Sequence, residues 1–383
     1  MAEITCIEDL RRLARKRVPR MFYDYVDGGS WTEYTYRANE EDFGKIEFRQ
    51  RVAVDIAERS TASTASTMVG QAVSMPVAIA PTGLAGMQHA DGEILAARAA
   101  QRFGIPFTLS TMSICPIEAV AEATGRHPFW FQLYVLRDRS FVEGLIERAR
   151  NANCSALVVT MDLQVFGQRH KDKKNGLSTP PRPTLRNLVN LASKPRWCWN
   201  MLGTRHRHFG NIVGHAKGVD SIGSLVEWTR EQFDPRLSWQ DIEWIRKRWN
   251  GKLIVKGIQD PEDARLAVES GADAIVVSNH GGRQLDGASS SISTLPRIVE
   301  AVGHRVEVHM DGGIRSGQDV LKAIALGARG TYIGRAMMYG LGALGEKGVA
   351  TALHLIRNEL DLSMAFCGKT DVRGVDREIL RMR

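Results

Sequence analysis

A histidine and an arginine lie close together in the run Ser278-Asn279-His280-Gly281-Gly282-Arg283. The imidazole of His280 can accept a proton near neutral pH. The guanidinium of Arg283 can bind a carboxylate through two parallel hydrogen bonds. A lone histidine after a buried strand is more often a satisfied core residue, but the two glycines and the arginine beside it favour a site. The pattern predicts a substrate that carries a carboxylate and a removable proton.

Two glycine-containing turns near the carboxyl end of the chain predict a phosphate site. Asp311-Gly312-Gly313-Ile314-Arg315 precedes a helical segment, and Gly334-Arg335 follows a later apolar run. Backbone N–H groups at glycines, a helix N-terminus and two arginines can together bind a phosphate. Glycine turns after strands are common, so it is the position in the last two strand–helix units that favours phosphate binding.

Two charged residues follow other apolar runs. Lys256 ends one run, where its ammonium group could either stabilise negative charge on a ligand or form a structural salt bridge. Asp162 follows another and could orient His280 and stabilise its imidazolium form. An isolated aspartate at such a place is more often a loop cap, so its spacing alone leaves both interpretations open.

A repeating framework must position these groups. From about residue 75, short apolar β-branched runs alternate with helical segments. We expect strands at 76–80, 106–109, 129–135, 156–161, 253–255, 274–277, 306–310 and 331–333. We expect helices near 90–103, 138–150, 239–249, 260–271, 294–302 and 317–326, and another from Pro116. Eight such units predict an α/β fold of the parallel (β/α)8 TIM-barrel type. A doubly wound sheet is less favoured, since no GxGxxG follows the first strand.

In such barrels the chemistry lies at the carboxyl ends of the strands. Each expected strand ends in polar or turn-forming residues, which a purely structural barrel would not require. These residues are Pro81 and Thr82, Ser110, Gln132 and Tyr134, Thr160 and Asp162, Lys256, Ser278 to His280, Asp311 to Gly313, and Gly334 with Arg335.

The segments outside the repeat add a cap and an insert. Residues 1–75 are helical and loop-like, with a hairpin expected near Gly44, and we interpret them as a cap on the barrel. Residues 165–238 form a long basic insert loop in the fourth strand–helix connection, and such loops are usually functional or mobile. Nothing resembles a linker, so we expect one domain over 1–383.

The net charge of +8 is concentrated in the insert. Between Lys171 and Lys217 there are ten basic residues and one acid, Asp172, which leaves the rest of the chain close to neutral. With Trp197 and Trp199, this segment could bind an anionic membrane surface, each cation contributing about 1 kcal/mol. A solvated basic loop is the alternative. No helix-turn-helix, RRM or zinc-finger pattern supports a nucleic-acid partner.

Other classes of protein are disfavoured by what the sequence contains. No apolar stretch approaches the length of a membrane-spanning helix, and the charged N-terminus does not resemble a signal peptide. The five cysteines are scattered and no CxxC, CxxCH or HExxH occurs, so we expect reduced thiols and no metal.

The motifs resemble those of the FMN-dependent 2-hydroxy-acid oxidase and dehydrogenase family. The most specific match is the run from Ser278 to Asp286, and the resemblance extends over nearly the whole chain from Tyr23-Asp24-Tyr25. Pro81-Thr82-Gly83, Phe131-Gln132-Leu133-Tyr134, Val255-Lys256-Gly257 and the turn from Asp311 to Arg315 also match. Phe233-Asp234-Pro235 and Trp239 are most similar to the bacterial L-lactate dehydrogenase branch.

The resemblance implies FMN over the barrel mouth and a role for each matching residue. His280 would be the catalytic base, paired with Asp162, with Tyr134 and Arg283 also catalytic. The substrate would meet Tyr25, Tyr134, Arg169 and Arg283. The cofactor would be held by Ala80, Pro81, Thr82, Ser110, Gln132, Thr160, Lys256, Ser278, Asp311, Gly312, Gly313, Arg315, Gly334 and Arg335.

The resemblance also implies a reaction: oxidation of an L-2-hydroxy acid, with L-lactate to pyruvate as the first expectation. Electrons would pass to a quinone or cytochrome, in a homotetramer bound peripherally at the cytoplasmic face of the inner membrane. The alternatives are an L-mandelate dehydrogenase, or a soluble cytoplasmic glycolate-type oxidase that uses oxygen. Gln168 stands where relatives often have arginine, which weakens the match at Arg169, and Gly83 stands where many have alanine.

Overall fold

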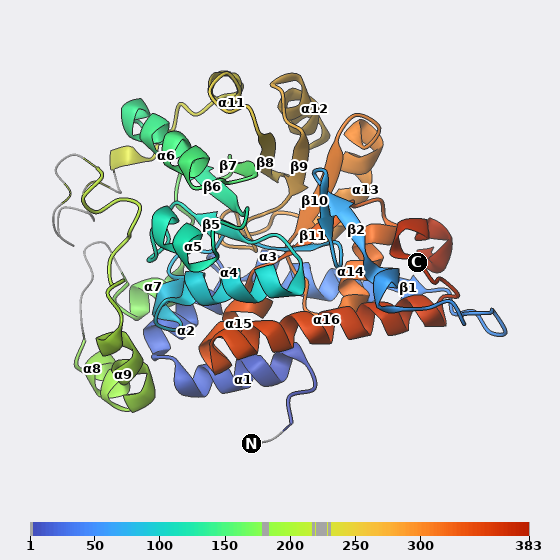
Figure 1. The fold of residues 1–383 in the computed structure, drawn as a ribbon, viewed down its shortest axis with the longest axis horizontal. Helices are drawn as coiled ribbons and strands as arrows, with labels where there is room; N and C mark the ends of the chain where they lie inside the picture. Colours follow the sequence, from blue (N-terminus) through green and yellow to red (C-terminus); the bar gives the residue numbers. More distant parts are fainter. Residues whose placement is uncertain (1–2, 178–183, 217–218, 220–227, 229–230, 383) are drawn as a thin grey trace.

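Eight parallel strands form the barrel in the computed structural model, which describes residues 3–177, 184–216, 219, 228 and 231–382 (Figure 1). The strands are β4 (Val77–Ile79), β5 (Thr108–Ser110), β6 (Trp130–Tyr134), β7 (Ala156–Thr160), β8 (Lys252–Ile258), β9 (Ala274–Val277), β10 (Glu307–Asp311) and β11 (Gly330–Ile333). Their order is β4-β11-β10-β9-β8-β7-β6-β5, and a parallel bridge between Ile79 and Phe107 joins the two ends. All eight predicted strands are confirmed, and so is the TIM-barrel class.

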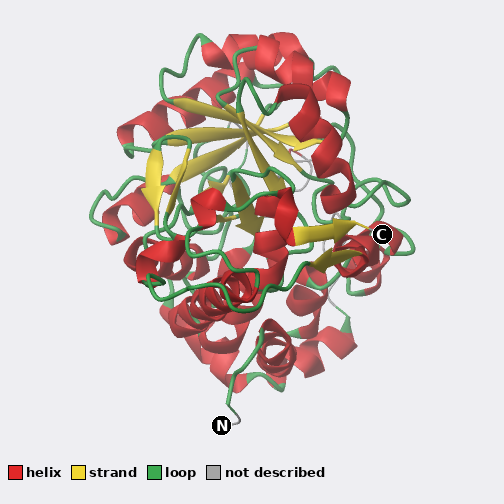
Figure 2. Ribbon diagram, turned by 90° about the vertical axis from the view of Figure 1, so that its right-hand side faces the viewer, coloured by secondary structure: helices red, strands yellow, loops and turns green. Residues whose placement is uncertain are grey.

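Helices surround the strands (Figure 2). They are α4 (Gly92–Phe103), α5 (Ile117–Ala123), α6 (Arg139–Asn151), α11 (Trp239–Arg246), α12 (Pro261–Glu269), α13 (Ser291–Val302), α14 (Gly317–Ala325), α15 (Arg335–Leu344) and α16 (Glu346–Phe366). Local sequence sets several of their ends. Asp260 caps α12 by accepting the Glu262 N–H, and Gly104 ends α4 in the left-handed region.

The barrel interior is filled by side chains from alternating strand positions. Trp130 and Tyr332 are the largest of them, and small residues such as Ala78, Ala156 and Ala274 make room for the two rings. The other strand faces, such as Leu157 and Val159, pack against the helices. Because both faces of each strand are buried, the strands appear in the sequence as continuous apolar runs.

The cap consists of α1 (Ile7–Arg17), α2 (Arg20–Val26) and α3 (Tyr34–Glu41), as Figure 1 shows. The hairpin expected near Gly44 is wrong. Gly44 lies in a 3-10 turn, and the next strand, β1 (Ile46–Phe48), pairs with β12 (Leu380–Met382) at the other end of the chain.

The hairpin near the barrel is instead β2 (Ser66–Met68) with β3 (Gln71–Val73). Its two turn residues, Val69 and Gly70, both have positive φ, as a type I′ turn requires. Valine is rare in that conformation, so Val69-Gly70 is a weak turn signal. The hairpin packs its Met68 and Val73 side chains against the interior residues of the barrel.

The insert is not the irregular loop that the sequence suggested. Its described part contains α7 (His170–Lys174), α8 (Leu185–Ala192) and α9 (Pro195–Gly203). Thr184 caps α8 and Pro195 occupies the first turn of α9, so ordinary start signals are present in a segment whose composition suggested a loop. Two of its predicted cations, Arg182 and Lys217, lie outside the described residues. No helix in the described part of the chain is long and apolar enough to span a membrane.

Candidate active site

The loop after β9 places His280 against Asp162, which follows β7. His280 has a left-handed backbone (φ 58°), and its main-chain N–H donates to the Ser278 hydroxyl over 3.1 Å. Its Nδ1 lies 2.9 Å from Asp162 Oδ1. When Nδ1 carries the proton and donates to this carboxylate, Nε2 is left as an acceptor. The pair expected from sequence is therefore formed, and its free nitrogen can take a proton.

The Asp162 carboxylate is held charged inside the mouth. Burial alone would raise the pKa of Asp162, but His280 and Lys256 outweigh burial and lower it. Its Oδ2 is buried with no hydrogen-bond partner among the described residues. Gly257, which has positive φ, packs directly against it, because a Cβ there would lie 2.7 Å from Asp162 Cγ. Any side chain at Gly257 would displace the aspartate.

Arg283, Arg169 and Tyr25 converge on one side of this pair. The guanidinium carbon lies 4.5 Å from the Tyr25 ring centre for Arg283 and 5.5 Å for Arg169. Arg283 Nη1 donates to the Tyr25 and Gly28 carbonyls, whereas its Nη2 is buried without a partner in the described part of the chain. Burial, followed by repulsion from Arg169, lowers the pKa of Arg283 to about 10. Arg169 pairs with Asp172 over 2.6 Å.

This arrangement leaves Arg283 as a desolvated cation that forms no ion pair with the described residues. A guanidinium remains protonated at neutral pH even with a pKa near 10, so Arg283 can bind an anion from outside the chain. A carboxylate on Nη2 would supply both the missing charge and the missing hydrogen-bond acceptor. The mouth is therefore suited to an anionic ligand.

Tyr134 lies at the end of β6 among these residues. Burial, and then the negative charge of Asp162, raise the pKa of its hydroxyl, so the phenol stays protonated. Its ring packs edge-on against Phe233 at 5.5 Å, and Phe233 in turn packs against Phe166 at 4.5 Å. An aromatic wall thus runs from Tyr134 towards the exposed Phe166 side chain.

A second polar group lies deeper in the mouth. Lys256 Nζ is 2.9 Å from Asp311 Oδ2 and 3.0 Å from the Ser278 hydroxyl, which itself donates to Asp311 over 2.9 Å. Lys256 is almost fully buried, and the negative charges of Asp311 and Asp162 outweigh burial and raise its pKa. The structure therefore joins three residues that the sequence placed on three separate strands.

Other predicted cofactor residues also gather at the mouth. Ser110 donates to Gln132 Oε1 over 3.1 Å, while Gln132 Nε2 is buried with no partner in the described chain. Thr160 is the register partner of Lys256. Ala80 is tied to β11 through the Ile333 carbonyl. These positions form one ring around the carboxyl end of the barrel, with Pro81 following Ala80 in the chain.

The expected phosphate region combines glycines of positive φ with two arginines that already contact other parts of the protein. Gly312 and Gly313 both have positive φ, and a Cβ at Gly334 would be 3.7 Å from Ala80 and 3.8 Å from Thr82. The arginine side chains are already engaged: Arg315 donates to Glu40 and the Ile314 carbonyl, and Arg335 donates to the carbonyls of Val26, Gly28 and Gly281. Each guanidinium keeps N–H groups beyond these contacts, so the region can offer an anion those groups as well as the main-chain N–H groups at the start of α15.

Several residues that hold the site escaped the sequence analysis. Gln284 Nε2 donates to the carbonyls of Asp162 and Val165 and so holds the loop after β7. Asn39 and Asn279 exchange two side-chain hydrogen bonds of 2.8 Å, which join the cap to the His280 loop. Gln284 and Asn279 belong to the motif around His280, and that adjacency was the available signal. Asn39 gave none.

The barrel and its mouth define an α/β-barrel protein with a histidine–aspartate pair beside a cationic pocket. The sequence matches the FMN-dependent dehydrogenase family over residues 14–382, and the chain belongs to that family. FMN is accordingly its cofactor.

Individual relatives and solved structures within this family are similar to the chain over nearly its whole length. The chain is 46% identical over 382 residues to the L-lactate dehydrogenase of Caulobacter vibrioides strain NA1000, covering 99% of this chain and 98% of that protein. It is 45% identical over 379 residues to the L-lactate dehydrogenase of Caulobacter sp. strain K31, covering 98% of each. The crystal structure of the monotopic membrane protein (S)-mandelate dehydrogenase matches with a TM-score of 0.93 and 35% identity over the whole of both chains. Mandelate oxidase matches with a TM-score of 0.84 and 35% identity, covering 100% of this chain and 99% of that chain.

Proposed function

We propose that this protein oxidises an L-2-hydroxy acid, with L-lactate as substrate and pyruvate as product. The observation that carries the proposal is the buried Nη2 of Arg283, which has no partner among the described residues and lies beside the His280–Asp162 pair. A carboxylate on the guanidinium would set the neighbouring hydroxyl-bearing carbon of the substrate against the imidazole. The identity of 45–46% to two L-lactate dehydrogenases over nearly the full chain supports L-lactate within this class.

The protein side chains divide the work between binding and proton transfer. Arg283 and Arg169, both of which contact the Tyr25 ring, bind the substrate carboxylate. Tyr134, kept protonated, donates a hydrogen bond to the substrate near its hydroxyl. His280 accepts at Nε2 a proton that the substrate loses as it becomes a keto acid, and Asp162 stabilises the resulting imidazolium.

The residues at the mouth fit FMN. When bound, it supplies the acceptor for the two electrons that leave the substrate. Gln132 Nε2 is a buried donor that lacks a partner among the described residues, and Ser110 and Thr160 lie on the same rim. Lys256 provides a buried positive charge fixed by Ser278 and Asp311. Gly312, Gly313, Gly334 and the start of α15 would hold the phosphate through main-chain N–H groups.

The test is anaerobic bleaching of the flavin absorbance of the purified protein by a panel of L- and D-2-hydroxy acids. We expect L-lactate to bleach it fastest and D-lactate not to bleach it. His280→Gln should retain FMN and lose bleaching by more than about 100-fold, because general base catalysis contributes about 10²–10⁴-fold. A purified protein without flavin bands, or a His280→Gln variant with full activity, would refute the proposal.

L-Mandelate is the second candidate substrate. The TM-score of 0.93 to (S)-mandelate dehydrogenase supports it, as does the absence of a side chain at Gly83. A Cβ there would lie 3.5 Å from the Tyr25 hydroxyl, so glycine leaves extra space beside the substrate residues. Faster bleaching by L-mandelate than by L-lactate would favour this candidate.

We propose further that the insert binds an anionic membrane surface and that electrons leave to a quinone or cytochrome there. Helices α8 and α9 expose an unusual number of large apolar side chains for a water-facing surface. Trp199 is 77% and Leu185 is 78% exposed. Exposed cations lie in the same segment, and α1, which this segment contacts through Lys194, carries others. The apolar set is Leu185, Leu188, Val189, Trp199 and Leu202, and the basic set is Arg186, Arg196, Arg205, Arg207, Arg12, Arg15 and Lys16.

The two helices are firmly attached behind this face. Trp197, expected at the lipid surface, instead stacks on Phe22 at 5.5 Å and donates its indole N–H to the Met87 carbonyl. Lys194 donates to the Lys16 carbonyl over 2.6 Å. The exposed side chains therefore project from a rigid base, which suits a peripheral contact with lipid at the cytoplasmic face of the inner membrane.

Co-sedimentation with vesicles tests this contact. Trp199→Ser with Leu202→Ser should weaken binding to vesicles that contain an anionic phospholipid, and wild-type protein should bind neutral vesicles poorly. Leu362→Ser is the matched control, because Leu362 is also exposed but lies on α16, away from α8 and α9 (Figure 1). Equal binding by the double variant would refute the contact. Stoichiometric hydrogen peroxide during turnover would favour the soluble oxidase instead.

A further inference from the structure

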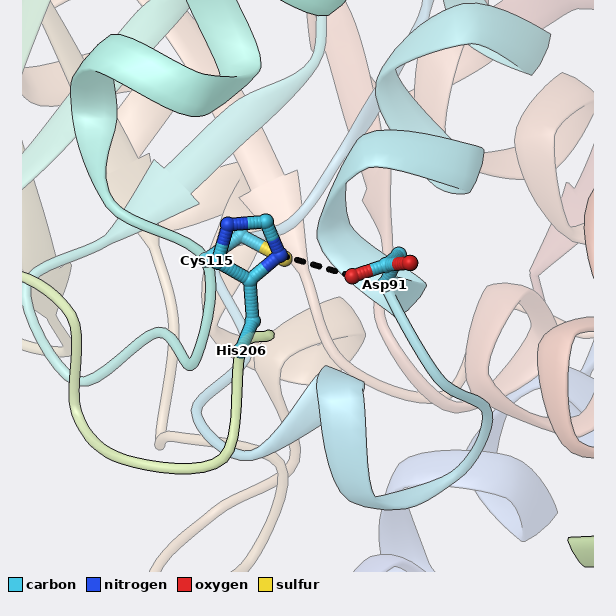
Figure 3. Close-up of side chains that lie close together, drawn as sticks. All are labelled: Asp91, Cys115 and His206. Atoms are coloured by element: carbon cyan, nitrogen blue, oxygen red, sulfur yellow. Dashed lines mark hydrogen bonds and ion pairs between the residues drawn. The ribbon is translucent and has the colours of Figure 1, made fainter. Parts of the chain in front are cut away.

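A second cluster of reactive side chains lies outside the barrel mouth (Figure 3). Asp91 precedes α4, Cys115 lies between β5 and α5, and His206 follows α9 in the insert. One ligand atom from each lies within 4.8 Å of the other two, and this is the one such group in the described part of the chain. A carboxylate oxygen, a thiol sulfur and an imidazole nitrogen thus converge from three segments.

Hydrogen bonds hold two of the three side chains, and the third is buried. His206 Nδ1 is 2.7 Å from Asp91 Oδ1, which also accepts the Thr204 hydroxyl over 2.5 Å. The His206 main-chain N–H donates to that same hydroxyl over 3.0 Å. Cys115 is fully buried, and its carbonyl accepts the Ser113 hydroxyl over 2.7 Å. A ligand would therefore need to order these side chains little when it binds.

The electrostatic setting favours a cation. Glu93 is also buried here, and it accepts main-chain N–H groups from Gly86, Ile114 and Cys115. Across the described residues, His206 is the sole ion-pair partner of Asp91, and Glu93 has none. Two carboxylates therefore flank one thiol, and neither is balanced by a lysine or arginine.

We propose that Asp91, Cys115 and His206 bind a zinc ion. Mixed nitrogen, oxygen and sulfur ligands suit Zn²⁺, whereas Mg²⁺ and Ca²⁺ prefer oxygen ligands alone. Three protein ligands leave a fourth position, which water can reach because Asp91 and His206 are partly exposed. Binding replaces the thiol proton, which is released to solvent. Ligands at about 2.0–2.2 Å from a tetrahedral ion are about 3.3 Å apart, so the Asp91–His206 pair must open by roughly 0.6 Å.

Such a site would join two segments of the chain. His206 belongs to the insert, whereas Asp91 and Cys115 belong to the barrel framework. A zinc ion would clip the segment after α9 to the barrel, next to the helices that expose the apolar face. The metal would thus fix the base of that face and take no part in the redox chemistry.

The experiment loads purified FMN-containing protein with Zn²⁺, dialyses it, and measures zinc per flavin. We expect one zinc per chain in the wild type and less than a tenth of that in His206→Asn and Cys115→Ala. His208→Asn and Cys154→Ser are matched controls outside the cluster and should retain it. Co²⁺ in place of Zn²⁺ should give visible bands beyond the flavin absorption in the wild type and in both controls, but not in His206→Asn or Cys115→Ala.

A melting curve of each variant without metal establishes that it is folded. If Cys115→Ala does not fold, His206→Asn decides alone, since His206 is partly exposed. No zinc retained by the wild type, or equal zinc in His206→Asn, would overturn the proposal. A zinc-dependent rise in melting temperature that His206→Asn abolishes would support it.

Discussion

Asp162→Asn isolates the contribution of one negative charge to the reaction. The amide has nearly the shape of the carboxylate, so the loop after β7 should keep its place. Gln284 contacts the Asp162 main-chain carbonyl, which the substitution leaves intact. What changes is the partner of His280 Nδ1, 2.9 Å away.

The size of the effect follows from this hydrogen bond. A hydrogen bond to a charged group contributes about 1.5–3 kcal/mol, and the site is partly shielded from water, with the Asp162 side chain 14% exposed. Because the imidazolium forms during the reaction, this energy is lost mainly from the transition state. At about 1.4 kcal/mol per tenfold, flavin reduction should slow by roughly 10- to 150-fold.

The assay is single-turnover bleaching of the flavin in a stopped-flow instrument without oxygen. The flavin content of Asp162→Asn must match the wild type, so that lost cofactor is not mistaken for lost rate. Asp371→Asn serves as the control, because Asp371 pairs with exposed Arg373 and should leave the rate unchanged. A wild-type rate in fully loaded Asp162→Asn would refute the role of the pair in proton transfer.

Three further predictions test other contacts. Arg283→Lys should raise the Kd for L-lactate by roughly tenfold or more in bleaching titrations, because parallel hydrogen bonds are lost; an unchanged Kd would contradict carboxylate binding there. Asp27→Asn should cost about 1.5–3 kcal/mol of unfolding free energy at pH 7 in urea. Burial would raise the pKa of Asp27, but the Arg11 contact and others lower it, so the difference should persist above about pH 4 and vanish as the pH falls through the lowered pKa; a constant difference down to pH 2 would contradict this. Gly83→Ala should reduce kcat/KM for L-mandelate more than for L-lactate, since the new Cβ would lie 3.5 Å from Tyr25; equal losses would argue against this space serving the substrate.

The barrel was predictable because its strands are buried on both faces. Runs such as Ala156 to Val159 are apolar at every position, and helix signals separate them. The cap was harder to predict, since β1 pairs with a strand from the opposite end of the chain. The residues of β1 do not indicate that its pairing partner is β12, at the other end of the chain. The hairpin at Val69-Gly70 was missed for another reason. The packing of Met68 and Val73 against the barrel interior overrides the poor turn propensity of valine.

The site was predictable to the extent that its residues end strands. The approach of His280 to Asp162 follows from two strand ends meeting at one mouth. The engagement of Arg335 does not follow, because its three bonds go to carbonyls in the cap and in the His280 loop. The residue type at a position indicates which chemical groups its side chain can bind. Which partner it finds depends on segments that the motif does not contain.

Unpaired buried atoms therefore carry information that the motif lacks, although not every such atom marks a site. Thr108 Oγ1 and Tyr332 Oη also lack partners among the described residues, yet they are neutral groups deep in the barrel, where buried water can satisfy them. At Arg283 the unpaired atom belongs to a cation next to a second cation. Water can satisfy the hydrogen bond there but cannot supply the charge. That distinction supports an anion as the ligand at Arg283.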